Sequence, residues 1–472
     1  MRKYLFTLSI IQILVVFTGS SQTLEWETPA IDQVNEESFH STLVHYPNAL
    51  LALKFDKKQS PWVLMLNGNW QFNEVSKPSE RPKEFPLPNF DASKWVNVRI
   101  TEILKPDTSK INVTFPLVPH ENNTVKSYRK VFPIPENWFG QQIFIRFDEI
   151  GAACYIWLNG KRVGYTETGY LGSEFNITPY VKFGRMNTLA VQTYKFSDGS
   201  WLFKNDSLVS DGIYGDVYLY SAPNLAIHDI KITSEMVNKN GHLKIVVDPK
   251  NSLASISGKF KLSLSLKDSE GKDIFPSIIK SFNPSRKSDS IIIFDQMIPV
   301  VKLWNPGDAY LYSVIIELKD KENQTIEAVS SKVGFRNIDI QKNFLSVNGI
   351  LIDSDLSKIQ DIPELKSLEE VKKFINSLKE NKQWVIVARN NLTNQKYLDL
   401  FDANGICVIE EVPFSIDEKN ILAIGKQPEW RQPVYLRVKK LVERDKNHPC
   451  IIKINMDEKL KGTNFDAAKK VL

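Results

Sequence analysis

The sequence predicts a multidomain protein in which two β-sandwiches are followed by parallel βα units. Three observations predict this fold class. The chain has 472 residues, which is too many for a single core because domains average ~150 residues. Short apolar runs separated by Gly, Pro, Asn and Asp extend from Trp62 to Asp339, as in all-β domains. Beyond Phe344, apolar residues recur at helical intervals between buried strands, as in βα units.

Residues 62–220 are typical of a jelly-roll β-sandwich. Their apolar alternations are short, evenly spaced and almost free of helical period. Asn159-Gly160 closes one alternation and is a strong hairpin signal, because both residues tolerate the positive φ of a tight turn. We expect a jelly-roll domain at residues 22–222, with strands at 142–147, 154–158, 162–166, 187–195 and 216–220.

Residues 224–339 predict a second all-β unit. The number of strand-length apolar runs is close to that of an immunoglobulin-like sandwich, and Trp304-Asn305-Pro306 marks a turn between two of them. We expect an immunoglobulin-like domain at residues 223–340, with strands at 226–233, 242–247, 259–266, 290–297 and 311–318.

The pattern changes to alternating helices and strands in residues 341–472. Ser367 and Glu370 have the spacing of a capping box, and the apolar residues that follow them recur at helical intervals. This alternation predicts parallel βα units. The predicted strands are 384–388, 406–409 and 450–454, and the predicted later helices are 393–403 and 433–444.

The N-terminus has the pattern of a secretory signal peptide. Arg2-Lys3 precedes an apolar run at residues 4–17, and the small residues Gly19-Ser20-Ser21 follow it. We expect a signal peptide at residues 1–21 and a secreted or periplasmic protein without a membrane partner. A retained membrane anchor is the alternative, although the run is short for a bilayer span.

The charge and the cysteine content argue against a nucleic-acid-binding protein, a disulfide-rich protein and a protein with a cysteine-based metal site. The net charge is +5, and Lys and Arg are spread along the chain, which argues against nucleic acid as a partner. Cys154, Cys407 and Cys450 each lie inside an apolar run, where a free cysteine behaves as a small buried hydrophobe. A disulfide framework and a cysteine-based metal site are therefore not expected.

The best catalytic candidate stands beyond the last apolar strand. The charged loop 444–449 leads into strand 450–454, and Asp457 and Glu458 follow it. In a parallel α/β barrel, the carboxyl ends of the strands carry the reacting groups, so Glu458 is a catalytic candidate. The alternative is that Glu458 begins a solvated surface loop, since most Glu residues are exposed.

A series of short motifs runs in a fixed order along almost the whole chain. They include Glu25-Trp26-Glu27-Thr28-Pro29, Leu66-Asn67-Gly68-Asn69-Trp70, Ser127-Tyr128-Arg129-Lys130, Trp157-Leu158-Asn159-Gly160, Gly212-Ile213-Tyr214-Gly215-Asp216-Val217, Val333-Gly334-Phe335-Arg336 and residues 444–458. With these motifs the chain resembles the β-galactosidase branch of glycoside hydrolase family 2. The resemblance implies a jelly-roll sugar-binding domain, an immunoglobulin-like domain and a catalytic (β/α)8 TIM barrel. That barrel is incomplete here, because residues 344–472 supply 129 residues of the ~250 that a barrel takes.

The resemblance also implies a reaction, the hydrolysis of terminal non-reducing β-D-galactose residues in carbohydrate metabolism. A retaining glycosidase uses an acid/base and a nucleophile, two carboxylates about 5 Å apart. Glu458 takes the acid/base position if one residue is deleted from the motif. Asp457 replaces the Asn that binds the sugar 2-hydroxyl in the family. The family's nucleophile lies on a later barrel strand, so no residue of this chain takes that role.

Two residues of the jelly-roll domain match family positions that contact the substrate. They are Asn123 and Asp206, and Asp206 is also the candidate sodium ligand. The alternative is that both are ordinary turn residues. The family's magnesium ligands are mostly lost, because residues 351–363 contain no His and residues 410–414 replace a Glu and a His.

Three hypotheses remain open from the sequence. The chain is a truncated β-galactosidase, a degenerate member that binds only carbohydrate or a partner through its β-domains, or a half-barrel that pairs with a C-terminal half or another copy. The altered motifs upstream of residue 472 favour the degenerate member, because truncation alone would leave them intact. An open half-barrel needs a covering chain, since unpaired strand edges promote aggregation.

Overall fold

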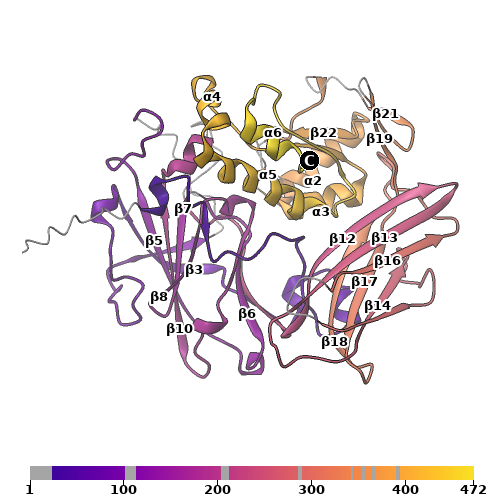
Figure 1. Ribbon diagram of the computed structural model, residues 1–472, viewed down its shortest axis with the longest axis horizontal. Coiled ribbons are helices and arrows are strands. Elements are labelled where there is room, and N and C mark those ends of the chain that lie inside the picture. The colour runs from indigo at the N-terminus through magenta and orange to yellow at the C-terminus, as the bar shows by residue number, and fades with distance from the viewer. Residues whose placement is uncertain are drawn as a thin grey trace, which may run out of the picture.

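The computed structural model describes residues 24–100, 113–151, 153–202, 212–284, 290–341, 344–352, 358–363, 365, 367–389 and 394–472. Two β-sandwiches lie side by side, and an α/β part lies over both of them (Figure 1). The predicted fold class, two sandwiches followed by a partial TIM barrel, is confirmed. The predicted signal peptide and Asp206 lie outside the described residues.

The first sandwich packs a seven-stranded sheet on a four-stranded sheet. Large aromatic side chains, among them Trp70, Trp138 and Phe175, fill the space between the two sheets. Asn159 and Gly160 have φ of 55° and 83°, as the predicted hairpin requires. In spatial order, the strands of the seven-stranded sheet are β1 (Gln33–Val34), β8 (Lys161–Thr166), β7 (Ala153–Leu158), β10 (Met186–Tyr194), β5 (Val125–Pro133), β3 (Gly68–Val75) and β4 (Val96–Ile100). The strands of the four-stranded sheet are β2 (Val63–Met65), β11 (Val217–Ala222), β6 (Gln142–Phe147) and β9 (Ser173–Asn176).

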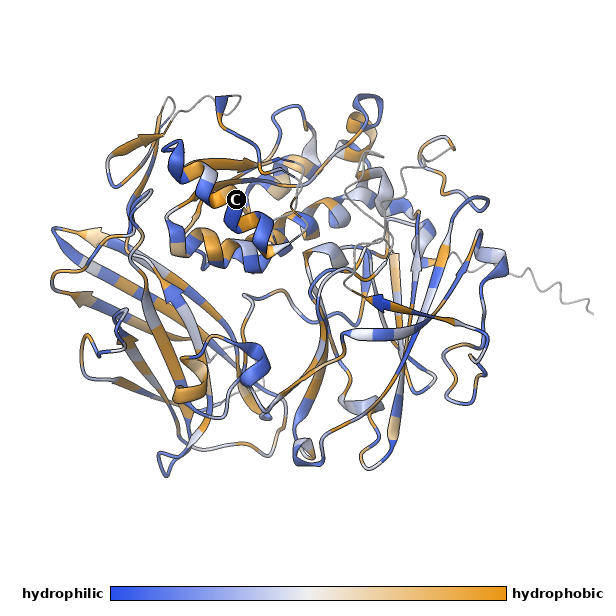
Figure 2. Cartoon of the chain, turned by 180° about the vertical axis from the view of Figure 1, so that it is seen from behind, coloured by the Kyte–Doolittle hydropathy of each residue, from blue (hydrophilic) through white to orange (hydrophobic). Residues whose placement is uncertain are grey.

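The second sandwich has seven strands in two sheets, two more strands than the five expected from the sequence. One sheet contains β12 (Leu225–Val237), β13 (Asn240–Asn251) and β16 (Ile292–Ile298). The other contains β15 (Ile278–Phe282), β14 (Phe260–Lys267), β17 (Tyr312–Lys319) and β18 (Thr325–Val333). In both sandwiches, polar and apolar segments alternate along the strands (Figure 2), as strands with one buried face require.

Both unexpected strands lack a continuous apolar alternation. β15 is an edge strand with three exposed side chains. The polar β18 is covered by a segment of the first domain, because Tyr46 and Ala328 exchange two backbone hydrogen bonds of 2.8 and 3.0 Å. The short helix α1 (Ala49–Ala52) belongs to the same covering segment. Such a long-range contact leaves no local signal in the sequence.

The α/β part begins with an antiparallel ribbon and continues with a parallel sheet. Helix α2 packs through Val371, Phe374, Ile375 and Leu378, and Ser367 Oγ accepts the Glu370 amide at 3.2 Å. The short helices α4 and α6, about two turns each, were not expected. The antiparallel ribbon consists of β19 (Ile338–Gln341), β20 (Phe344–Val347) and β21 (Ile350–Ile352). The parallel strands are β22 (Val385–Ala388), β23 (Cys407–Glu411) and β24 (Ile451–Asn455). The helices are α2 (Leu368–Glu380), α3 (Gln395–Asn404), α4 (Glu418–Lys426), α5 (Arg431–Asp445) and α6 (Thr463–Lys469).

Helix α5 connects the α/β part to the first sandwich through buried charges. Arg437 Nη1 lies 2.7 Å from Asp32 Oδ1, and both side chains are buried. Three residues further on, Lys440 Nζ lies 2.5 Å from Glu36 Oε1, and this pair is also buried. Because both carboxylates come from one short segment of the first domain, the pairs fix how α5 lies on that domain.

The second sandwich meets the α/β part at Trp304, in the predicted turn. The indole is fully buried and donates to the Asp402 carbonyl of α3 at 2.8 Å. A predicted surface turn therefore also serves as a domain contact.

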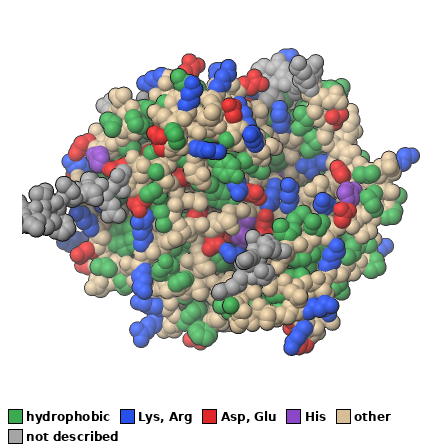
Figure 3. Space-filling view, in the orientation of Figure 1, with side chains coloured by type: hydrophobic (Ala, Val, Ile, Leu, Met, Phe, Trp, Pro, Cys, Tyr) green, Lys and Arg blue, Asp and Glu red, His purple; other side chains and the backbone are tan. Residues whose placement is uncertain are grey.

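Three global properties follow from the described residues. In those ranges, no helix combines the length and apolar content needed to cross a bilayer. Cys154, Cys407 and Cys450 are all free and buried, which confirms the prediction. On the face seen in Figure 3, Lys and Arg side chains are interspersed with Asp and Glu and form no single basic stripe.

Replacing Arg437 with Met should lower the free energy of the first unfolding transition by about 3–5 kcal/mol, because Asp32 would remain buried without its cation. Urea unfolding followed by tryptophan fluorescence measures this change. Arg431→Met is the matched control, since Arg431 is exposed at the start of the same helix, and it should change stability by less than about 0.5 kcal/mol. Equal effects of the two variants would contradict the role assigned to the buried pair.

Candidate functional site at the carboxyl edge of the parallel sheet

The parallel strands place four charged residues at one edge. Arg389 follows β22 directly, and its Nη1 lies 2.5 Å from Asp361 Oδ1. Its Nε lies 3.8 Å from Oε1 of Glu411, the last residue of β23. Asp457 follows β24 and is close enough to influence Glu411. The carboxyl ends of parallel strands form the functional edge of an α/β barrel, so this cluster is the candidate site.

Glu411 has the most perturbed carboxyl in the cluster. Burial raises its pKa, the Arg389 guanidinium opposes the rise, and Asp457 and Asp361 add to it. Glu411 therefore keeps its proton to a higher pH than an exposed glutamate does. A carboxyl of this kind can donate a hydrogen bond or a proton to a bound polar ligand.

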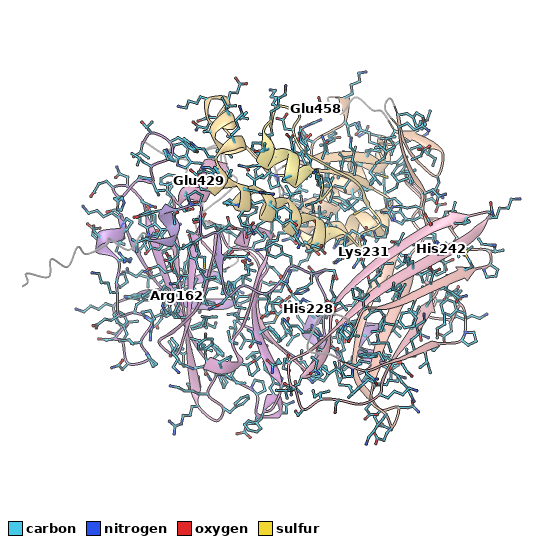
Figure 4. The ribbon with its side chains drawn as sticks, in the orientation of Figure 1. Arg162, His228, Lys231, His242, Glu429 and Glu458 are labelled. Carbon is cyan, nitrogen blue, oxygen red and sulfur yellow. The ribbon has the colours of Figure 1, made fainter. Side chains whose placement is uncertain are left out.

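Glu458 lies three residues beyond the end of β24, on a turn at the outer surface of the α/β part (Figure 4). Its side chain is exposed, so its environment matches the surface-loop alternative. Asp457 Oδ1 accepts the Lys459 amide at 2.9 Å, which closes the turn. The predicted acid/base and its neighbour are therefore at the correct edge, but Asp457 also has a local structural role.

The neighbouring Glu410 points into the protein. Successive strand residues face opposite sides, and the Glu410 side chain is 2% exposed with Arg444 Nη2 at 4.0 Å. Glu410 and Glu411 consequently do not converge on one ion, and Glu411 already faces a guanidinium. A magnesium ion needs several oxygen ligands around one centre, so these residues do not fit the family's magnesium ion.

Asn123 serves the loop that precedes β5. Its Nδ2 donates to the carbonyls of Pro119 and Phe196 at 3.0 and 2.9 Å, and its Oδ1 accepts the Phe196 amide at 2.8 Å. The side chain is fully buried, and both of its donors are used. The structure therefore favours a loop-fixing role over the predicted substrate contact.

Sequence reasoning missed a polar cluster at the amino end of β24. His448 Nδ1 lies 2.6 Å from Asp402 Oδ2, and the Cys450 amide donates to Asp402 Oδ1 at 2.7 Å. Burial alone would lower the pKa of His448, but Asp402 and other carboxylates raise it to about 9. Burial also raises the pKa of the Cys450 thiol.

These three side chains lie within 4.8 Å of one another, as metal ligands do. Both Asp402 oxygens already accept hydrogen bonds, from His448 and from the Cys450 amide, and the thiolate rather than the neutral thiol is the usual metal ligand, so we describe the cluster as a structural ion pair. The Asn-His-Pro loop was visible in the sequence, whereas its partner Asp402, more than forty residues earlier, had no signal.

Two sandwiches that support a parallel sheet with a charged carboxyl edge define a multidomain chain of the glycosidase type. Family models match three consecutive segments. Residues 63–223 match the sugar binding domain of glycosyl hydrolases family 2, residues 225–336 match the model described as glycosyl hydrolases family 2, and residues 392–471 match the TIM barrel domain of that family. The chain belongs to glycoside hydrolase family 2.

Curated relatives are β-galactosidases. The β-galactosidase of Priestia megaterium is 28% identical over 472 residues, which cover 93% of this chain and 46% of that protein. The enzyme of Halalkalibacterium halodurans is 28% identical, with 89% and 43% covered. The β-galactosidase large subunit of Leuconostoc lactis is 27% identical, with 91% and 73% covered. The chain thus spans about half the length of the first two relatives.

Solved structures show the same fold at lower identity. A β-glucuronidase of Bacteroides uniformis aligns with a TM-score of 0.69 and 20% identity, covering 87% of this chain and 49% of that one. A β-galactosidase homologue of Bacteroides fragilis, titled as putative, aligns with a TM-score of 0.65 and 18% identity, covering 84% and 59%.

The ion pair of His448 should make stability depend on pH. The folded pKa of about 9 exceeds the ordinary value of 6.5, so the bound proton stabilises the folded protein fully below pH 6.5. This stabilisation, on the order of 3 kcal/mol, is lost as the pH rises through about 9. The stability difference between the wild type and His448→Gln should therefore shrink between pH 6.5 and 9.5. A difference that stays constant over this range would contradict a charged His448.

Proposed function

We propose that the protein acts on terminal non-reducing β-D-galactose residues and that this chain binds the galactoside without hydrolysing it alone. The observation that carries the galactoside assignment is the match to β-galactosidases over about nine tenths of the chain. The charged carboxyl edge of the parallel sheet, with Glu411 and Asp457, is the binding site in this proposal.

The arrangement of carboxylates supports binding rather than turnover by this chain. A retaining glycosidase needs an acid/base and a nucleophile about 5 Å apart. Here the Arg389 guanidinium lies between Asp361 and Glu411, and Glu458 is exposed on a turn. Among the described residues, the edge therefore offers polar contacts for sugar hydroxyls but no pair of carboxylates poised for double displacement.

Strand β24 supports a covering partner. Within the described ranges, β24 pairs only with β23, and an open strand edge needs cover. In this proposal, further barrel strands, from the same protein or from a partner chain, cover β24 and supply the nucleophile.

Galactose should bind the purified chain in isothermal titration calorimetry, and Glu411→Gln or Asp457→Asn should weaken binding about tenfold or more, because hydrogen bonds to charged groups contribute about 1.5–3 kcal/mol. Glu429→Gln, an exposed carboxylate on the same part of the chain (Figure 4), should leave the affinity unchanged. Preferential binding of glucuronate would contradict the galactoside assignment.

The same preparation should release no product from an aryl β-galactoside. Turnover that Glu458→Gln abolishes would overturn the binding-only role and assign the acid/base function to Glu458. Turnover that survives this substitution would indicate a contaminant or another acid, which Glu411→Gln would distinguish.

We also propose that the protein is exported to the periplasm or secreted. The charged, apolar and small-residue pattern of residues 1–21 supports this location. Expression in a bacterial host that processes signal peptides should yield a mature protein that begins at Gln22, as N-terminal sequencing would detect. An intact N-terminus in the membrane fraction would instead support the retained anchor.

A further inference from the structure

A cavity of about 380 Å³ lies where all three domains meet. It is lined by the first-domain segment that covers β18, by β18 itself, by α3 and by the loop after α5. Helix α3 runs back from the carboxyl edge to the amino ends of the strands, and the cavity reaches His448 at the amino end of β24. This cavity is therefore separate from the charged carboxyl edge.

Most polar groups that line the cavity already have partners within the protein. Asn447 binds the backbone of β12 through both its oxygen and its nitrogen. His448 is bonded to Asp402 and Gln395, and Ser330 Oγ donates to the Ala52 carbonyl. These groups shape the wall, and their hydrogen-bonding capacity is largely used.

Two lining groups, Asp399 and Lys332, retain unused hydrogen-bonding capacity. Within the described ranges, the Asp399 carboxylate makes no hydrogen bond, although it is exposed to the cavity. The hydroxyl of Tyr46 is itself buried without a hydrogen-bond partner, so Tyr46 offers the cavity its ring and not its hydroxyl. Lys332 Nζ donates to Ser313 Oγ at 3.0 Å, and an ammonium has three donors.

The charges in the cavity balance. Arg444 pairs with Asp445, and His448 pairs with Asp402. The remaining opposite charges are Asp399 and Lys332. An anionic ligand would face Asp399 and a cationic ligand would face Lys332, and each contact between like charges is unfavourable.

The environment of these two groups also disfavours charge. Burial raises the pKa of Asp399, with Asp402 adding to the rise, and burial lowers the pKa of Lys332. Lys332 Nζ lies 4.1 Å from the centre of the Phe55 ring and donates to Ser313 Oγ. Ligand hydroxyls suit the site better, because a hydroxyl donates to Asp399 and accepts from Lys332.

We propose that this cavity binds a neutral saccharide of one or two rings. Its volume is within the range of small-molecule sites, about 300–1,000 Å³, which combine apolar walls with a few polar groups. Tyr46, Phe55 and Leu311 supply the apolar wall. This site does not depend on the proposed function of the carboxyl edge, and a ligand in it contacts all three domains and stabilises their assembly.

The proposal is tested by titrating the full chain and two variants with D-galactose, D-glucose and lactose. Calorimetry measures the affinity, and thermal unfolding measures the melting temperature. Lys332→Met removes the ammonium but keeps most of the apolar side chain, and the ligand-free melting temperature reports whether this variant stays folded. Its affinity for at least one saccharide should fall about 3- to 10-fold, as expected for one hydrogen bond. Asp399→Leu should weaken the same binding about tenfold or more.

Glu429→Gln, an exposed carboxylate that belongs to neither site, is the matched control and should leave saccharide binding unchanged. Asp457→Asn changes the carboxyl edge and separates binding there from binding in the cavity. Binding that Asp457→Asn weakens, and that both cavity variants leave intact, would overturn the cavity site while supporting the carboxyl edge. Glycine and inorganic phosphate complete the set of probes. If glycine raised the melting temperature more than the saccharides do, and Asp399→Leu removed this effect, the cavity would be a zwitterion site. The same result with phosphate would identify an anion site. Either result would overturn the saccharide assignment.

Discussion

The arrangement of the three domains depends on the charges that α5 carries into the protein interior. An ion loses several kcal/mol of hydration on burial, which only a well-placed partner and further hydrogen bonds offset. Arg437 and Lys440 find their partners, Asp32 and Glu36, in one short segment of the first domain. A displaced helix would leave four buried charges unpaired. We infer that these pairs select one orientation of the α/β part, since apolar contacts alone tolerate small shifts more readily.

In this fixed orientation, the two ends of the parallel sheet differ in how their charged groups are exposed and paired. At the carboxyl end, the two carboxylates of β23 point to opposite sides of the sheet. Glu410 faces the buried Arg444, and Glu411 faces the edge. At the amino end, His448 and Asp402 form an ion pair beside the cavity that all three domains line. Charge at the first end is exposed to incoming ligands, whereas charge at the second end is mostly satisfied within the protein. The chemistry of each end therefore follows from the direction of the strands and from the period-2 alternation of their side chains.

The sequence predicts those features that local pattern determines. The hairpin at Asn159-Gly160, the cap at Ser367 and the three parallel strands each depend on residues close together in the chain, and the structure contains them all. Strand β18 was missed because its polar face is covered by a segment almost 300 residues away. The ion pairs of α5 and the partner of His448 were missed for the same reason. For Asn123 the resemblance suggested a substrate contact and the local pattern a turn residue, and its hydrogen bonds in the structure fix a loop.

The two ends of the sheet also differ in what they require of the rest of the protein. The carboxyl edge resembles half of a catalytic site, because a retaining mechanism needs a second carboxylate from further barrel strands. The cavity needs only the domains already present, because Tyr46, Lys332 and Asp399 come from one part each. In our proposal, a chain whose edge holds the Arg389–Asp361 pair instead of a catalytic pair still recognises carbohydrate. The assembly of three domains by buried charges is what makes such recognition independent of turnover.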